Sequence, residues 1–255
     1  MKRYLLYLVL MGQFIGAGLA QQQTTAPPGT HAIAAPMPSA ESVWADLMEG
    51  NRRFVNGKTA AVNMVTLRQA LAKGQAPKVV VLACSDSRVA PEILFDKNLG
   101  DLFVVRAAGN IADTIGVGSI EYAVEHLGSS VLVVLGHEKC GAVTAACSGD
   151  KMPTANLQAM VDKIAPAVTR AKTHASSDQL VEAATLENVH QSARDVLASS
   201  EVLQHFLHDG KLTVFEAVYK LDSGEVKLLR TISEHDDHSD SFSDIKTAKM
   251  PRSRN

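Results

Sequence analysis

The chain has 255 residues, of which 46% are hydrophobic and 20% are charged, and its formal net charge is -2 at pH 7. This is the composition of an ordinary globular protein, and the length favours one folded domain with a substantial core. The slightly negative charge provides no excess positive potential for nucleic acid or anionic lipid. A small neutral or anionic substrate fits these values better.

The first twenty residues are organised as a secretory signal peptide. Residues 1–3 are basic, and the apolar stretch 4–19 leads to small residues at Gly18 and Ala20. We expect cleavage after Ala20 and an exported mature protein, periplasmic or secreted, that is not in the membrane. An uncleaved membrane anchor is the alternative. No later stretch is apolar over the ~20 residues that a membrane span requires.

Composition divides the remaining chain into three parts. Residues 21–38 are rich in Gln, Thr, Ala and Pro and predict a flexible linker. The folded domain is expected to span residues 39–233, and the polar residues 234–255 predict a disordered tail. We interpret the sequence His-Asp-Asp-His at 235–238 as part of that solvated tail rather than as a metal site.

Apolar residues recur at helical spacing where the domain begins: Val43, Trp44, Leu47 and Phe54. We expect an N-terminal helical arm here, which Gly57 can end, and we interpret Trp44 as a packing anchor.

Continuous apolar runs then predict strands buried on both faces, at residues 79–82, 102–105 and 131–135. A helix is expected between the last two, at residues 119–127. Strands that alternate with helices predict an α/β fold with a central, mostly parallel sheet flanked by helices. Ligand sites in such sheets lie at the carboxyl ends of the strands.

The second half of the chain is expected to be helical for roughly sixty residues after Gly149, with an apolar stripe within residues 186–197. Residues 212–221 and 225–229 then predict a strand, a turn and a strand that close one edge of the sheet.

Metal-ligating residues follow two of the predicted strands. Cys84 follows the first strand, and His137 and Cys140 follow the third. Thiolate and imidazole suit zinc, and three protein ligands leave the fourth tetrahedral position for water, as in a catalytic site. We therefore predict a catalytic zinc ion. A disulfide between the two cysteines is the competing interpretation, although an odd total of three cysteines argues against a disulfide framework.

Asp86 and Arg88 lie just beyond Cys84, where a loop can hold a carboxylate against a guanidinium. An ionised Asp86 can accept the hydrogen bond of zinc-bound water and orient it. Two alternatives stay open: the ion pair is only structural, or Asp86 itself fills the fourth zinc position in a closed state.

These residues are similar to the signature of the β-class carbonic anhydrases, C-S-D-S-R at 84–88 followed by G-H-x-x-C-G at 136–141. Further segments also resemble the family: G-N-R-R-F at 50–54, F-V-V-R at 103–106, I-E-Y-A-V at 120–124 and E-N-V at 187–189. The resemblance runs from about residue 41 to residue 229 and is greatest to the plant-type, open-site subgroup.

The resemblance implies reversible hydration of carbon dioxide to bicarbonate and a proton, by attack of hydroxide on a zinc ion held by Cys84, His137 and Cys140. Zinc lowers the pKa of its bound water to about 7, a value that comes from carbonic anhydrase itself. The resemblance also implies that Asp86 and Arg88 form the catalytic dyad. It further implies a homodimer or a dimer of dimers, with each active site at the subunit boundary.

The family's substrate-binding residues correspond to Gln75, Phe103, Tyr122 and Gly141. Gln75 resembles a glutamine that hydrogen-bonds substrate, and Gly141 resembles a residue whose backbone N–H contacts bicarbonate. Phe103 and Tyr122 resemble pocket walls, the latter from the neighbouring subunit. His126 stands where the subgroup has a proposed proton shuttle, and a surface histidine on a helix is the alternative.

Two positions depart from the family pattern. Val81 stands where the subgroup with an allosteric bicarbonate site has tryptophan, so we expect that pocket to be absent although Arg106 is present. Ala108-Gly109 stands where plant-type enzymes have Val-Ala, and these smaller side chains would make the pocket wider. We favour the open form, with water on zinc.

Other functions were weighed against this one. In a thiol enzyme Cys84 would be the nucleophile, but Arg88 follows it too closely for a phosphatase-type loop. The same scaffold can act on carbon disulfide or carbonyl sulfide, and a non-catalytic protein can hold structural zinc, although three strong ligands beside a dyad disfavour this. Cys147 is interpreted as a small buried apolar residue.

Overall fold

The computed structural model describes residues 38–234, and within them five strands form one sheet in the order β2-β1-β3-β4-β5. The strands are β1 (Val79–Ala83), β2 (Leu102–Arg106), β3 (Val131–His137), β4 (Thr213–Tyr219) and β5 (Val226–Ile232). The first four run parallel, and β5 runs antiparallel to β4. The predicted α/β fold with a mostly parallel sheet is confirmed, and the predicted strand, turn and strand form one edge of it.

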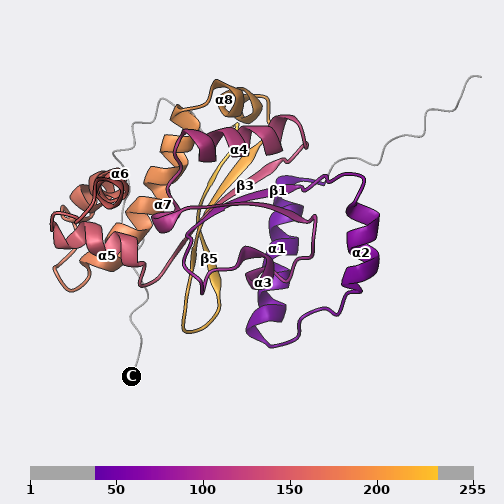
Figure 1. The fold of residues 1–255 in the computed structure, drawn as a ribbon, viewed down its shortest axis with the longest axis horizontal. Coiled ribbons are helices and arrows are strands. Elements are labelled where there is room, and N and C mark those ends of the chain that lie inside the picture. The colour runs from indigo at the N-terminus through magenta and orange to yellow at the C-terminus, as the bar shows by residue number, and fades with distance from the viewer. Residues whose placement is uncertain (1–37, 235–255) are drawn as a thin grey trace, which may run out of the picture. The chain divides into compact units, whose positions relative to one another are not determined.

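Helices flank this sheet (Figure 1). They are α1 (Ala40–Val55), α2 (Met64–Leu71), α3 (Pro91–Leu94), α4 (Thr114–Glu125), α5 (Gly141–Ser148), α6 (Ala155–Ala171), α7 (Leu180–Ala198) and α8 (Glu201–His208), with a short 3-10 turn η1 (Ala108–Asn110). The helix predicted at 119–127 is α4, which begins earlier because the Asp113 side chain accepts from the Gly116 N–H and caps it. The short helices α2, α3 and α5 were not predicted.

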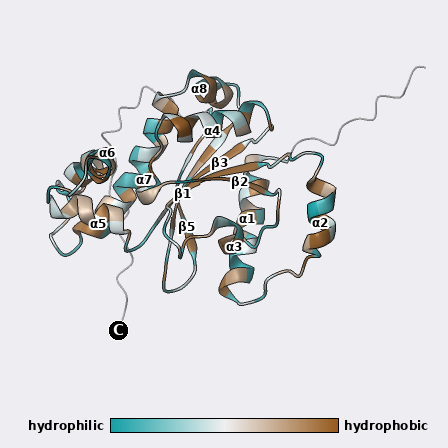
Figure 2. Ribbon diagram, in the orientation of Figure 1, coloured by the Kyte–Doolittle hydropathy of each residue, from teal (hydrophilic) through white to brown (hydrophobic). Residues whose placement is uncertain are grey.

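The strands β1 and β3 are buried along their whole length, as their apolar runs predicted. Alternate residues face opposite sides of the sheet. One set packs against α4, α7 and α8: Val80, Leu82, Leu132 and Val134. The other set packs against α1 and α3: Val79, Val81, Val131 and Val133. Figure 2 shows the strands among the most hydrophobic elements, between helices with teal segments.

The first helix, α1, lies on the second of these faces. Ser39 caps it by accepting a hydrogen bond from the Ser42 N–H, and it ends at Val55, two residues before Gly57. The Trp44 ring stacks on Phe215 of β4 with centroids 4.8 Å apart, so Trp44 packs within its own chain. A large aromatic pair of this kind fixes α1 on the sheet.

On the opposite face, α7 packs directly against β3 beside the candidate site. The predicted apolar stripe of α7 is confirmed at its buried positions Val189, Ala193 and Val196. A Cβ atom at Gly136, on β3, would lie 2.4 Å from Val189 Cγ2. The absence of a side chain at Gly136 is therefore what allows the close approach of α7.

The predicted signal peptide, most of the linker and almost all of the tail lie outside the described residues. Within residues 38–234, no helix has both the length and the apolar character needed to cross a membrane.

Candidate metal centre

The strand order brings the three predicted zinc ligands together. β1 and β3 are neighbours, with Ala83 paired to Leu135, so Cys84 leaves the sheet beside His137. The ligand atoms of Cys84, His137 and Cys140 lie within 4.8 Å of one another, and all three residues are buried. The two sulfurs are 4.0 Å apart and both cysteines are free, so this geometry is not a disulfide.

The imidazole of His137 has one nitrogen satisfied and one without a partner. Nδ1 lies 2.8 Å from the backbone carbonyl oxygen of Glu138, and because that oxygen only accepts, Nδ1 carries the proton. Nε2 then has no proton and carries a free lone pair, and it is buried without a hydrogen-bond partner. A buried unpaired nitrogen is costly unless something binds it. Beside two thiols, this orphaned atom fits zinc.

Backbone N–H groups surround the two sulfurs. The Gly109 N–H donates to Cys84 Sγ at 3.2 Å, and the Asp86 N–H does so at 3.4 Å. The contact with Cys140 lowers the pKa of Cys84, and these two N–H groups act in the same direction. The same contact, together with burial, raises the pKa of Cys140. Because thiolates are the form that binds a metal, zinc binding would release the protons that these sulfurs carry.

Cys140 is also placed at the start of a helix. It is the N-cap residue of α5, and the N–H groups of Val143 and Ala142 act to lower its pKa, against the larger raising effects of Cys84 and of burial. Hydrogen-bond donors around a thiolate reduce the charge that it gives to a metal. Such donors would offset part of the charge that two thiolate ligands give to a metal.

The loop after Cys84 holds Asp86 against Arg88. Arg88 Nε donates to Oδ1 at 2.9 Å, Nη2 donates to Oδ2 at 2.7 Å, and the Arg88 backbone N–H donates to Oδ1 at 3.0 Å. These bonds hold the pKa of Asp86 well below its usual range. Its Oδ2 lies 3.9 Å from His137 Nε2, so an ionised carboxylate borders the position that a metal would take.

Arg106 secures this loop from the neighbouring strand. At the end of β2, its Nε donates to the Cys84 carbonyl oxygen at 3.0 Å, and its Nη2 donates to the Asp86 carbonyl oxygen at 2.7 Å. Because these bonds fix the backbone on both sides of Ser85, Arg106 has a structural role here. Val81, where another subgroup has tryptophan, is fully buried in the sheet.

Gly141 lies next to the ligands, whereas Gln75 does not. Gly141 is the first residue of α5, exposed, and a Cβ there would meet no atom within 4 Å, so its backbone borders open space. Gln75 precedes β1, at the opposite end of the strand from Cys84. With five residues in β1 and about 3.3 Å per residue, the strand alone separates them by roughly 16 Å.

Phe103, Tyr122 and His126 form a separate aromatic row on β2 and α4. Phe103 pairs with Val80 in the register of the sheet, toward its middle rather than its carboxyl end. The Phe103 and Tyr122 rings are 6.3 Å apart, and the Tyr122 and His126 rings are 5.4 Å apart. Both Tyr122 and His126 are exposed.

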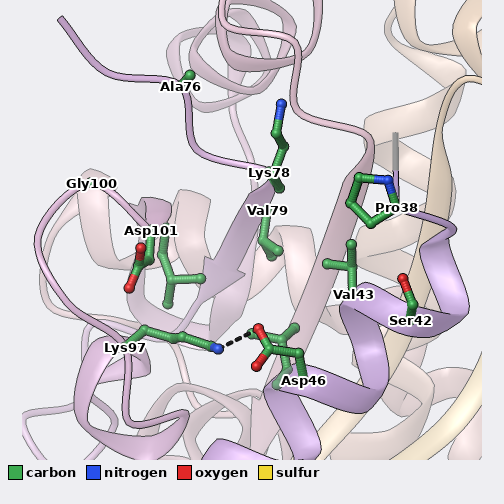
Figure 3. A pocket seen from close by; sticks show the side chains of 12 residues that line it. Pro38, Ser42, Val43, Asp46, Ala76, Lys78, Val79, Lys97, Gly100 and Asp101 are labelled. Carbon is green, nitrogen blue, oxygen red and sulfur yellow. Dashed lines mark hydrogen bonds and ion pairs between the residues drawn. The ribbon is translucent and has the colours of Figure 1, made fainter. Parts of the chain in front are cut away.

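A pocket lies at the other end of the sheet, where β1 and β2 begin (Figure 3). Its lining includes Lys78, Lys97 and Asp101, and Lys97 Nζ is 2.5 Å from Asp46 Oδ2 across its wall. This pocket contains none of the candidate metal ligands.

Sequence reasoning did not predict that Gly109 and Asn188 touch the site. Gly109 donates to Cys84 Sγ, and its carbonyl oxygen accepts a hydrogen bond from Asn188 Nδ2 at 2.7 Å. The Gly-Asn pair at 109–110 is a turn signal, and both residues have positive φ, +76 and +46. That signal marks a turn after β2, but the partner on α7 is 79 residues away in the chain and only the fold reveals it.

A parallel α/β sheet with Cys, His and Cys at two neighbouring strand ends and a carboxylate beside them defines a class of zinc enzyme. Residues 79–226 match the family model described as carbonic anhydrase. Carbonic anhydrase 2 of Mycobacterium tuberculosis is 38% identical over 205 residues, which cover 79% of this chain and 94% of that protein. A carbonic anhydrase of Pseudomonas aeruginosa is 35% identical, covering 72% and 86%.

Solved structures agree with this likeness. The β-carbonic anhydrase of Coccomyxa in complex with acetazolamide has a TM-score of 0.61 and 30% identity, covering 73% of this chain and 86% of that one. The β-carbonic anhydrase CcaA also has a TM-score of 0.61, with 25% identity, covering 76% and 96%. The chain belongs to the β-class carbonic anhydrases, lyases that use zinc to hydrate carbon dioxide reversibly to bicarbonate.

Proposed function

We propose that this chain hydrates carbon dioxide beside a zinc ion held by Cys84, His137 and Cys140, with Asp86 and Arg88 as the catalytic dyad. The observation that carries the proposal is the buried Nε2 of His137, which has no partner and faces two thiols. Zinc, when bound, acts as a Lewis acid that makes water nucleophilic near neutral pH.

The protein's own groups would then orient the reactants. Asp86, kept ionised by Arg88, accepts a hydrogen bond from the reacting water and fixes its direction. Both Asp86 oxygens accept from Arg88, which supports the open form, in which Asp86 is not a metal ligand. We propose that the backbone N–H of Gly141, at the start of α5, contacts bicarbonate.

The direct test is stopped-flow carbon dioxide hydration with zinc analysis on the same sample. We expect about one zinc ion per chain and hydration that a chelator abolishes and added zinc restores. Full hydration by zinc-free protein would overturn the proposal. Assays with carbon disulfide and carbonyl sulfide on that sample identify the preferred substrate.

We further propose that the active unit is a homodimer or a dimer of dimers. Gln75 and Phe103 lie far along the sheet from their own chain's metal ligands, so as substrate-binding residues they would have to serve a second copy. β2 is an edge strand whose first four residues are apolar, and Ile115 and Tyr122 on nearby α4 are exposed. Two similar β-carbonic anhydrases from Sordaria macrospora are described as tetrameric.

Complementation between inactive variants tests this arrangement. Cys84→Ser removes the metal from one chain, and Gln75→Ala removes the glutamine from the other. If Gln75 serves the neighbouring subunit, co-refolded mixed dimers contain one complete site and regain activity. If mixing restores nothing while sedimentation shows mixed dimers, Gln75 does not act across the boundary.

For the exposed His126 we propose proton transfer to solvent, which its place beside the Tyr122 ring supports. His126→Ala should slow hydration in dilute buffer, and added imidazole should restore the rate. A rate that is unchanged at every buffer concentration would show that His126 is only a surface histidine.

We propose that the protein is exported, because residues 1–20 have the order of basic, apolar and small residues that signal peptides show. N-terminal sequencing of protein from the periplasmic fraction should begin at Gln21. An intact Met1 in membrane-bound protein would indicate the uncleaved anchor instead.

A further inference from the structure

A buried asparagine on α7 reaches the backbone beside the metal site. Asn188 is 0% exposed, and its Nδ2 donates to the Gly109 carbonyl oxygen at 2.7 Å. Since a carbonyl oxygen can only accept, the side-chain atom that faces it must be the amide nitrogen. The other end of the amide, Oδ1, is buried without a partner. Asn188 is therefore placed for one strong hydrogen bond rather than for complete satisfaction of its polar atoms.

Gly109, the residue that Asn188 holds, is itself bonded to the site. Its N–H donates to Cys84 Sγ at 3.2 Å. Its φ of +76° favours glycine, and a Cβ there would lie 2.7 Å from Ile164 Cδ1. Because glycine has few restrictions on its backbone dihedral angles, the peptide groups on either side of it need hydrogen bonds to other residues to keep one orientation. Asn188 provides that hold on the carbonyl side.

The next residue strengthens the same connection to α7. Asn110 has φ of +46°, and its Nδ2 donates to Ser192 Oγ at 3.3 Å. Asn188 Nδ2 is also 3.4 Å from Asn110 Oδ1. The turn η1 is thus tied at two points to one helix, and that helix packs on β3 beside His137 through Gly136.

We propose that Asn188 is a positioning residue of the metal site: through Gly109 it aims a backbone N–H at Cys84 Sγ and so limits the charge that this thiolate donates to zinc. The inference rests on the proposed zinc site and deepens it. Two thiolates neutralise the charge of a divalent zinc ion, so donors to sulfur keep the metal a stronger Lewis acid.

Cobalt(II) in place of zinc gives a readout that does not depend on activity, because sulfur-to-cobalt charge transfer absorbs light. Asn188→Leu removes the donor and roughly preserves the volume. With the N–H less well aimed, the sulfur lone pairs rise in energy, and the charge-transfer band should move to longer wavelength. Because the lost hydrogen bond also orients a metal ligand, transfer of zinc from this variant to a chelator should become about 10-fold faster.

Asn51→Leu is the matched control. Asn51 is also a buried asparagine that donates to backbone carbonyl oxygens, those of Leu94 at 3.0 Å and Gly224 at 2.9 Å, but it lies on the other face of the sheet. This variant should keep the parent's cobalt spectrum and rate of zinc transfer, even where its stability falls. Should Asn188→Leu not fold, Asn188→Ala removes the same donor and carries the same expectation.

The outcomes separate this inference from the proposed function. An unchanged charge-transfer band in a fully cobalt-loaded Asn188 variant overturns the positioning role, as does an equal shift in Asn51→Leu, which would indicate general loosening. A parent protein that binds no metal at Cys84, or hydrates no carbon dioxide with zinc bound, overturns the proposed function instead.

Discussion

The two faces of the sheet each bury an asparagine, and they use it differently. On the α1 face, Asn51 donates to two carbonyl oxygens and accepts from the Val226 N–H at 2.9 Å, so all its polar atoms are paired. On the α7 face, Asn188 leaves its Oδ1 unpaired, and at the carboxyl end of β3 His137 leaves its Nε2 unpaired. Full pairing indicates a structural role, whereas the unpaired nitrogen of His137 lies among the candidate metal ligands, where a function needs it.

Two aspartate–arginine pairs repeat this contrast. Asp96 pairs with Arg53 of α1, Nε to Oδ2 at 2.5 Å, and Asp86 pairs with Arg88 beside the metal ligands. Only Asp86 also approaches His137 Nε2. The same kinds of bond should therefore have different roles in the two places. Substitutions at the metal site should reduce activity, and substitutions on the α1 face should reduce stability.

The largest expected effect is that of Cys84→Ser. A serine hydroxyl is a poor zinc ligand, so we expect no bound zinc, and hydration reduced to background. Zinc analysis and stopped-flow hydration measure both. Cys147→Ser, at the cysteine outside the ligand group, should keep zinc and rate. If Cys84→Ser still bound one zinc ion per chain, Cys84 would not be a metal ligand, and the contrast between the metal site and the α1 face would fail.

Asp86→Asn should keep zinc but lose about 10²-fold in hydration rate, because the neutral amide no longer accepts the hydrogen bond of the water as an ionised carboxylate does. Asp96→Asn is the matched control on the other face and should hydrate at the parent rate. Equal rates for Asp86→Asn and the parent would reduce the Asp86–Arg88 pair to a structural ion pair.

Asn51→Leu should lower the free energy of unfolding by about 3 kcal/mol, because it removes the side-chain partner of three backbone groups. Denaturant unfolding measures the loss, and the folded fraction should hydrate carbon dioxide at the parent rate. A stable Asn51→Leu with impaired hydration would show that the α1 face also serves the site.

The smallest expected effect is a pH-dependent one, at Asp96. The Arg53 guanidinium holds the pKa of Asp96 below its usual value, so the pair stabilises the fold above the unfolded pKa of about 3.9 and less as pH falls. Asp96→Asn tolerates the residue's φ of +47° and should cost about 1 kcal/mol at pH 7. Unfolding at several pH values should show the difference fading toward pH 2. A constant difference would exclude the charge as its cause.

Much of the fold was predictable because the apolar runs at 79–82 and 131–135 are too continuous for exposed strands and too short for helices. The helix α4 was predicted with a late start, since its first turn carries Gly116 and depends on capping by Asp113. The helix α2 has no buried residue, so it has no apolar stripe from which to predict it.

At the site, the sequence by itself determined the choice of metal. The residue types and spacing of Cys84, His137 and Cys140 are enough for this, because thiolate and imidazole side chains favour zinc. Which atoms surround them was decided by tertiary structure. The Gly109 N–H and the Asn188 amide come from a turn and a helix far apart in the chain, and backbone donors leave no trace in residue type. The pairing of β2 with β1 brings the Gly109 N–H to the sulfur, and the packing of α7 on the sheet brings the Asn188 amide to Gly109.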